Sequence, residues 1–76
     1  MARIMYDTTE VYRAEVRYAN VTCYYGPYEG PAGKGQAKRR TRDQARPGLI
    51  ESKVQKLDVV WDDIRDAYLG WVDVDD

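Results

Sequence analysis

Strict alternation of apolar and polar residues marks the first element of the chain. Within residues 10–18 the apolar side chains occupy every second position: Tyr12, Ala14, Val16 and Tyr18. A half-buried β-strand has this period of two, because successive side chains point to opposite faces of the sheet. Residues 19–20 are a short turn candidate, and residues 21–25 are rich in β-branched and aromatic side chains, which favour a returning strand. The pattern therefore predicts a β-hairpin over residues 10–25.

A loop and a helix are expected after the hairpin. Residues 26–31 contain two glycines and two prolines, which favour a loop, and Pro31 suits the first turn of a helix because its missing N–H group is not needed there. Residues 32–46 then predict a helix that ends before Pro47 and Gly48. The apolar stripe of this helix consists of small residues at intervals of four: Ala37, Thr41 and Ala45. Small side chains allow a close approach to a sheet but bury little area.

The alternation over residues 49–61 predicts a third strand. Its candidate inward-facing residues fall into two groups of opposite parity, namely Ile50, Ser52 and Val54 and then Leu57, Val59 and Trp61. Either both faces of this strand are partly covered or a β-bulge shifts its register.

The last part of the chain shows the spacing of a short helix. Four apolar residues at i, i+3, i+7 and i+8 define one helical face: Trp61, Ile64, Tyr68 and Leu69. Asp62 and Asp63 lie where a helix N-terminus favours acidic side chains, and Gly70 lies where a helix is capped. We expect a helix of about two turns here, followed by a last short strand or a packed tail over residues 71–74.

Together these elements predict a single small α+β domain over residues 1–76, with residues 1–9 and 73–76 as candidate flexible ends. The expected order is β-β-α-β followed by a short C-terminal helix, with one helix packed on a small antiparallel sheet made of a β-hairpin plus a third strand. A 76-residue domain buries a limited share of its surface and often depends on a partner for stability. Self-association as a homo-oligomer is therefore one expectation.

Composition excludes most catalytic and metal chemistry. The chain has no histidine and a single cysteine, Cys23, which excludes an intrachain disulfide, a structural zinc site and a Ser/His or Cys/His catalytic pair. Residues 30–35 lack the spacing of a glycine-rich phosphate loop. No apolar run approaches the ~18–20 residues of a membrane span, and residues 1–7 lack the apolar stretch of a signal peptide. We expect a cytoplasmic protein without enzymatic activity, cofactor or membrane association.

Charge is segregated along the chain, although the formal net charge is only −1. Residues 34–46 hold one acid, Asp43, and six basic residues: Lys34, Lys38, Arg39, Arg40, Arg42 and Arg46. Four of the six recur every four residues and would form one ridge along the helix. Such a ridge could follow a phosphate backbone or bind an acidic protein. It could equally be a solvated face whose positive charge is balanced by the acidic end of the chain, within the molecule or in a dimer.

The acidic end of the chain spans residues 58–76, where seven aspartates accompany one base, Arg65. The simplest interpretation is helix N-terminal charge followed by a polar tail. One alternative is a surface that engages a basic host protein or imitates the phosphates of DNA. Another is a divalent-ion site in which Asp62 and Asp66 act as a pair at i, i+4. The candidate partner-binding residues of this segment are Asp62, Asp63 and Asp66.

Aromatic residues are unusual in kind, with seven tyrosines, two tryptophans and no phenylalanine. Tyrosine suits surfaces that are apolar on one side and wet on the other. Tyr24, Tyr25 and Tyr28 cluster before the basic helix, where they could form a stacking platform for bases or lie partly in the core. Tyr28 is also a candidate for partner binding, whereas Trp61 and Tyr68 are expected in the core or at its rim.

Three segments resemble known sequences. They are the strand over residues 11–16, the turn Tyr25-Gly26-Pro27-Tyr28 with Gly35-Gln36-Ala37-Lys38 of the helix, and the strand Glu51-Ser52-Lys53-Val54-Gln55-Lys56-Leu57. In these segments the chain resembles a group of small, mostly uncharacterised proteins encoded by bacteriophages of actinobacteria. The resemblance implies a phage origin and action in the cytoplasm of an infected host. It implies no activity and assigns no functional residue.

The sequence thus favours a non-catalytic protein that acts by binding, with a host or phage protein as the preferred partner. The alternative is nucleic-acid binding through the basic helix, with these binding residues: Lys34, Lys38, Arg39, Arg42 and Arg46. Dedicated nucleic-acid-binding domains carry an excess of basic charge, and this chain carries none overall.

Overall fold

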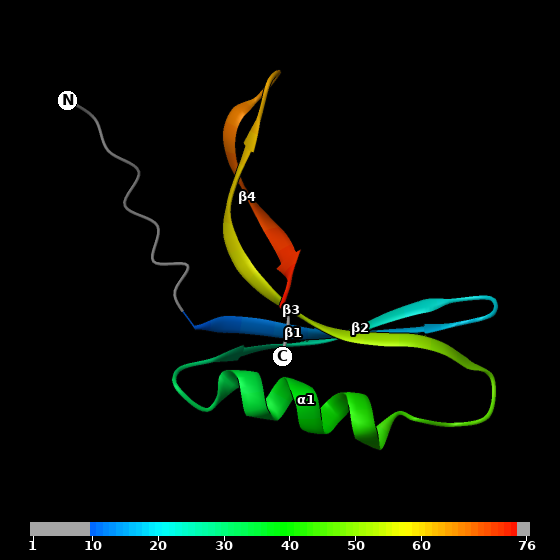
Figure 1. Cartoon of the computed structure of the whole chain (residues 1–76). Coiled ribbons are helices and arrows are strands. Elements are labelled where there is room, and N and C mark those ends of the chain that lie inside the picture. Colours follow the sequence, from blue (N-terminus) through cyan, green and yellow to red (C-terminus); the bar gives the residue numbers. More distant parts are fainter. Residues whose placement is uncertain (1–9, 75–76) are drawn as a thin grey trace.

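A four-stranded antiparallel sheet carries one α-helix on one face (Figure 1). The structure, a computed structural model, describes residues 10–74. The elements in chain order are β1 (Val11–Tyr18), β2 (Thr22–Glu29), α1 (Gly33–Asp43), β3 (Leu49–Asp62) and β4 (Asp66–Asp73). The strand order is β2-β1-β3-β4, and each neighbouring pair is antiparallel. The predicted α+β class, with an antiparallel sheet and one packed helix, is confirmed.

β3 belongs to two parts of the molecule. Its residues 49–56 pair with β1, and its residues 55–62 pair with β4. In Figure 1 the β3–β4 hairpin rises away from the layers formed by β1, β2 and α1. We call residues 57–71, the projecting part of this hairpin, the arm. We call β1, β2, α1 and residues 49–56 the body.

The helix is too short to cover the whole of β3. α1 has 11 residues, which span about 16 Å at ~1.5 Å per residue. β3 has 14 residues, which span about 46 Å at ~3.3 Å per residue. α1 contacts β1, β2 and β3, and within residues 10–74 it makes no contact with β4. In the described part of the chain, the arm therefore lacks a helical layer.

Small residues let α1 lie close to the sheet. Ala37 is completely buried and forms a cluster with Ala14 of β1 and Val54 of β3. At Gly33 a Cβ atom would lie 2.6 Å from the carbonyl oxygen of Tyr28, so only glycine fits there without a shift. The rim of this thin core consists of larger side chains: Tyr12, Tyr25, Tyr28 and Val74. The predicted close approach of the helix is confirmed at Ala37.

Two boundaries in the body differ from the prediction. β2 continues through Gly26 and Pro27 to Glu29, because a register shift against β1 accommodates the extra residues within the strand. α1 ends at Asp43 instead of residue 46, so Ala45 lies beyond the helix and is exposed.

The predicted C-terminal helix is wrong, and with it the expected order, since the chain runs β-β-α-β-β. Residues 61–70 form the end of β3, a turn and the larger part of β4. The Asp62 carboxylate accepts hydrogen bonds from the backbone N–H groups of Ile64 (2.7 Å) and Arg65 (3.1 Å). It therefore closes a turn instead of starting a helix. Gly70 lies inside β4 and not at a helix end.

The change of parity along β3 follows the division into body and arm. The register shift of β3 against β1 lies near its start, and the pairing then runs regularly from residue 51 to residue 62. Val54 faces α1 in the body. Leu57, with the apolar residues of the same parity that follow it, therefore lies on the opposite face. β3 therefore buries Val54 toward α1 in the body and carries Leu57, Val59 and Trp61 on the opposite face in the arm.

The two predicted flexible ends are only partly covered by the structure. Residues 1–9 and residues 75–76 lie outside the described residues. Asp73 ends β4, and the N–H group of Val74 donates a hydrogen bond to the carbonyl oxygen of Val54 (2.9 Å).

Candidate functional site

One face of the arm is apolar along its whole length. Three cross-strand pairs form this apolar face: Leu57 with Trp71, Val59 with Leu69, and Trp61 with Ala67. They share a face because strand residues two apart point to the same side. Trp61 is 79% exposed, and Ile64 in the adjoining turn is 92% exposed. The other five residues of the face are half-buried. Exposed apolar residues that adjoin further apolar surface, as Trp61 and Ile64 do, are typical of an interaction surface.

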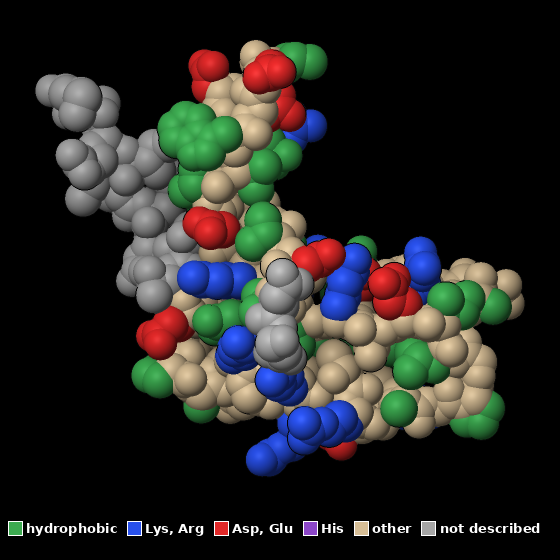
Figure 2. All heavy atoms as spheres, in the orientation of Figure 1, with side chains coloured by type: hydrophobic (Ala, Val, Ile, Leu, Met, Phe, Trp, Pro, Cys, Tyr) green, Lys and Arg blue, Asp and Glu red, His purple; other side chains and the backbone are tan. Residues whose placement is uncertain are grey.

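The end of the arm is acidic. Residues 62–66, which we call the tip, contain one base, Arg65, and three acids: Asp62, Asp63 and Asp66. The Arg65 guanidinium stacks on the ring of Tyr68, 4.6 Å from its centre. Figure 2 shows acidic side chains gathered at the free end of the arm. The structure thus brings the three acidic candidates together, in a turn between two strands.

The arrangement of the tip removes the basis for the divalent-ion interpretation. Asp62 and Asp66 face each other across the turn, as a strand pair and not at i, i+4 on a helix. One Asp62 oxygen is already used by two backbone N–H groups. Among residues 10–74, no group of three or more His, Cys, Asp or Glu side chains could hold a metal ion.

A stacked arginine anchors the base of the arm to the body. The guanidinium of Arg13 lies between two aromatic rings, 4.1 Å from the centre of Tyr24 and 4.5 Å from the centre of Trp71. Its Nε donates a hydrogen bond to Oε1 of the buried Gln55 (2.8 Å). These side chains come from all four strands. The stack therefore determines where the arm leaves the sheet.

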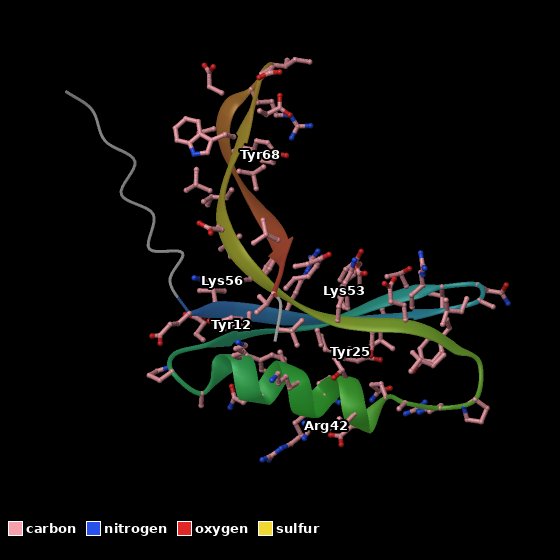
Figure 3. The ribbon with its side chains drawn as sticks, in the orientation of Figure 1. Tyr12, Tyr25, Arg42, Lys53, Lys56 and Tyr68 are labelled. Carbon is pink, nitrogen blue, oxygen red and sulfur yellow. The ribbon has the colours of Figure 1, made fainter. Side chains whose placement is uncertain are left out.

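Charge-assisted hydrogen bonds extend this anchor. Nε2 of Gln55 donates to Oδ1 of Asp73 (3.0 Å), and Nζ of Lys53 donates to Oδ2 of the same carboxylate (3.3 Å). The two bonds lower the pKa of Asp73, and the bond to Asp73 raises the pKa of Lys53. Figure 3 shows Lys53 on one side of the sheet and Tyr25 on the other, between the sheet and α1. The anchor thus lies on the face that α1 leaves open.

The basic candidates lie on α1 and just beyond it. Arg39 and Arg42 are exposed on the helix, and Figure 3 shows Arg42 on the side of α1 that faces away from the sheet. Arg46 is also exposed but lies in the connection after α1, so the predicted ridge loses its last member. Lys34 and Lys38 are half-buried on the helix. We call Arg39, Arg42 and Arg46 the basic face, and Figure 2 shows basic side chains gathered over α1, far from the tip.

Tyr28 belongs to the helix side of the body and not to the arm. Its hydroxyl accepts a hydrogen bond from Nε of Arg40 (3.3 Å), and this bond raises the pKa of Arg40. Tyr28 is half-buried and, beside Arg40, lines a shallow hollow of about 230 Å³ with Gln36, Arg39 and Asp43. Tyr28 and the acidic tip therefore do not form one surface.

The sheet separates the three tyrosines that precede the helix. Tyr24 stacks on the open face, whereas Tyr25 and Tyr28 pack against the core under α1. The register shift in β2 allows these last two to point the same way. The Tyr25 hydroxyl donates to Oε1 of Gln44 (3.3 Å), and burial raises the pKa of Tyr25. The predicted stacking platform of three neighbouring tyrosines is not formed.

The acidic tip and the basic face are kept apart within one molecule. α1 makes no contact with β4 within residues 10–74, and Figure 1 shows the arm rising on the far side of the sheet from α1. The tip therefore does not balance the charge of the basic helix inside the molecule, and the interpretation that the acidic end of the chain as a whole, residues 58–76, does so stays a prediction. The last two acids of the chain lie outside the described residues. Charge balance between the basic helix of one molecule and the acidic end of another stays a prediction.

The two most exposed apolar residues of the arm lie where the sequence pattern did not predict them. Trp61 is expected in the core or at its rim but is 79% exposed, and Ile64, assigned to a helical face, is 92% exposed. The signal that could have found them is alternation on both sides of an aspartate-rich turn. Apolar residues occupy every second position over residues 57–61 and again over residues 67–71, which is the pattern of a hairpin.

The candidate surfaces are the apolar face and tip of the arm and the basic face of α1. No helix among the described residues is long and apolar enough to cross a membrane. No protein-family model, curated protein or solved structure matches this chain.

Proposed function

We propose that the chain is a non-catalytic binding protein whose binding element is the arm. One observation carries this proposal: a projecting two-stranded ribbon exposes an apolar face and ends in Trp61 and Ile64, which are 79% and 92% exposed. A two-stranded hairpin alone is only marginally stable in water. Tryptophan is enriched among the residues that dominate binding energy. The arm therefore has the composition of an interface and gains stability when a partner covers it.

The partner in this proposal is a protein whose apolar surface is bordered by basic groups. The apolar face of the arm needs an apolar counterpart, and the tip, with three acids and one base, favours positive charge beside it. A host or phage protein as the partner, and the cytoplasm of an infected host as the place of contact, belong to this proposal. They rest on the resemblance of the three sequence segments.

Two hollows lined by described residues are smaller than a usual small-molecule site, which favours binding through a surface over binding in these two hollows. The hollow beside Tyr28 measures about 230 Å³, and a second one, beside Arg13 and Trp71, measures about 160 Å³. Small-molecule sites usually enclose roughly 300–1,000 Å³. The chain also has no histidine, the side chain most often used for proton transfer near neutral pH.

Affinity capture with arm variants tests this proposal. The immobilised wild-type chain and a Trp61→Ser/Ile64→Ser variant are exposed to an actinobacterial lysate, and bound proteins are quantified by mass spectrometry. We expect a protein that the wild type retains and the variant loses at least about tenfold, because the two most exposed apolar side chains lie at the contact.

Ile50→Ser is the matched control for this experiment. Ile50 is an exposed apolar residue of the body, with 58% of its surface accessible. Its replacement removes exposed apolar surface away from the arm, though less than the double variant does, and leaves the capture unchanged. A protein that all three chains retain equally, or no specifically retained protein, contradicts an arm-centred binding function.

Nucleic-acid binding is the second candidate, and the basic face favours it. Arg39, Arg42 and Arg46 are exposed together, with Asp43 as the acid among them. If this face binds phosphates, fluorescence anisotropy of labelled DNA or RNA shows an affinity that falls steeply with salt and is lost in Arg39→Glu/Arg42→Glu. The absence of binding at low salt contradicts this candidate.

A further inference from the structure

We infer that the arm of one copy docks on the basic face of a second copy, so that the chain associates with itself. The inference rests on the proposed function, because it names a partner for the same arm. The surface involved on one side is the tip with the adjoining Trp61 and Ile64. On the other side it is the outer face of α1 with the connection that follows.

Charge complementarity is the first argument for a second copy as the occupant. The tip carries a net charge of −2, whereas residues 39–46 carry four arginines and one aspartate. Within one molecule these two groups lie on opposite sides of the sheet, and α1 does not contact β4 in the described residues. Because the tip and the basic face do not meet each other within one molecule, a contact between the two forms only between two molecules. A second copy always supplies the opposite charge.

The chemistry of the side chains is the second argument. Among the described residues three arginines lie over four aromatic rings, with distances to the ring centres from 4.1 to 5.1 Å. Trp61 is the most exposed ring of the arm, at 79%, and Arg39 and Arg42 are exposed guanidinium groups one helical turn apart. The aliphatic stems of arginines cover apolar surface while their heads stay in water. The basic face thus suits both the charge of the tip and the exposed Trp61 and Ile64 beside it.

A two-fold axis between the two copies allows this contact to form twice within one dimer. If the arm of the first copy lies on α1 of the second, a two-fold axis places the arm of the second on α1 of the first. Two identical contacts then form at once, and each covers an element that is exposed in the single chain. The expected assembly is therefore a dimer that weakens as salt screens its charges.

Exchange of the two charges is the sharpest test. In the tip variant, Asp63→Lys/Asp66→Asn changes the tip from −2 to +1, and asparagine tolerates the positive φ of 66° at position 66. In the helix variant, Arg39→Glu/Arg42→Glu makes the basic face acidic at two exposed helical positions. Each variant alone places like charges at both contacts of its dimer. A mixed dimer places opposite charges at both contacts.

Sedimentation velocity at low salt then gives a defined pattern. The wild type forms a dimer, each variant alone dissociates with a constant raised at least about tenfold, and an equimolar mixture of the two variants dimerises again. Glu29→Lys, a charge change at an exposed residue at the end of β2, is the matched control and still dimerises. Circular dichroism confirms that every variant is folded.

Two results overturn the inference. One is a wild-type chain that sediments as a monomer at low salt, and the other is a mixture of the two variants that stays monomeric. Neither result touches the capture experiment with Trp61→Ser/Ile64→Ser, whose readout is a different protein. Failure of self-association and failure of arm-mediated binding to another protein are therefore separate outcomes.

Discussion

The body and the arm share strand β3, but the apolar residues of this strand differ in solvent exposure between the two regions. Val54, under α1, is 7% exposed, whereas Trp61, seven residues later in the same strand, is 79% exposed. Both are apolar residues in regular β-structure. The difference is the covering layer, because a sheet buries a face only where another element packs on it. In the body, apolar side chains stabilise the fold, and in the arm they are available for contact.

The largest effect is expected where α1 lies closest to the sheet. In Gly33→Ala the new Cβ meets the carbonyl oxygen of Tyr28 at 2.6 Å, so the helix must shift, and we expect the free energy of unfolding to fall by about 1–3 kcal/mol. In the matched variant Gly35→Ala the new Cβ meets no atom within 4 Å among the described residues. Better helix propensity should raise the stability of this variant by up to about 1 kcal/mol.

Urea unfolding followed by circular dichroism measures both glycine variants. Equal changes at the two positions would contradict the close packing of α1 on the body.

The base of the arm should show the next largest effect. Trp71→Ala removes one of the two rings that enclose the Arg13 guanidinium, and we expect the free energy of unfolding to fall by about 1–2 kcal/mol. Hydrogen exchange should accelerate over residues 57–71 more than in the body, because the arm loses its anchor. Trp71→Phe keeps a ring at this place and should recover most of the loss. Uniform acceleration through both regions would show that the arm is not a separate unit.

Acidification should weaken the same anchor through Asp73. Its pKa in the folded chain lies below the ordinary value of 3.8, because Gln55 and Lys53 donate hydrogen bonds to the carboxylate. A lowered folded-state pKa means that the stabilisation is complete above the unfolded-state pKa and is lost as the pH falls through the folded-state value. The stability difference between wild type and Asp73→Asn should thus be constant well above the unfolded-state pKa and should shrink as the pH falls through the lowered folded-state pKa. A difference that grows on acidification would contradict this linkage.

The smallest effect on stability is expected at the exposed end of the arm. Trp61→Ala should change the free energy of unfolding of the monomeric chain by no more than about 0.5 kcal/mol, because the side chain is already 79% exposed. The free energy of unfolding of Trp61→Ala is measured beside that of Trp71→Ala, in dilute protein at high salt so that the chain is monomeric. The pair of variants compares the two tryptophans of one hairpin. A loss as large as that of Trp71→Ala would mean that Trp61 is covered within the single chain.

The body could be predicted from local pattern, and the arm could not. The regular alternation over residues 10–18 predicts a half-buried strand. The small residues around Ala37 predict a helix that packs closely on the sheet. Residues 61–70 satisfy two periods at once, since Trp61, Ile64 and Tyr68 fit a helical face while the flanking alternation fits a hairpin. Pairing with residues 57–60 decides between them, and that pairing is a tertiary contact.

The candidate site shows the same division. The acidic residues of the tip could be picked out as a group from their density in the sequence, whatever structure they adopt. That Tyr28 lies apart from them, under α1, follows from the register shift in β2. No count of residues shows such a shift. The alternation on both sides of the turn indicates a hairpin, but it does not show that Trp61 is exposed, since the apolar character of this side chain predicts burial.

The sequence by itself determined the α+β class, the strand-forming and helix-forming segments of the body, the separation of basic from acidic segments, and the lack of histidine-based or disulfide chemistry. Only the tertiary structure decided which apolar residues are covered. The physical reason is length: a helix of 11 residues reaches about 16 Å along a strand of 14 residues that extends about 46 Å. Where α1 ends, β3 continues without a second layer among residues 10–74, and Trp61 near its end is exposed.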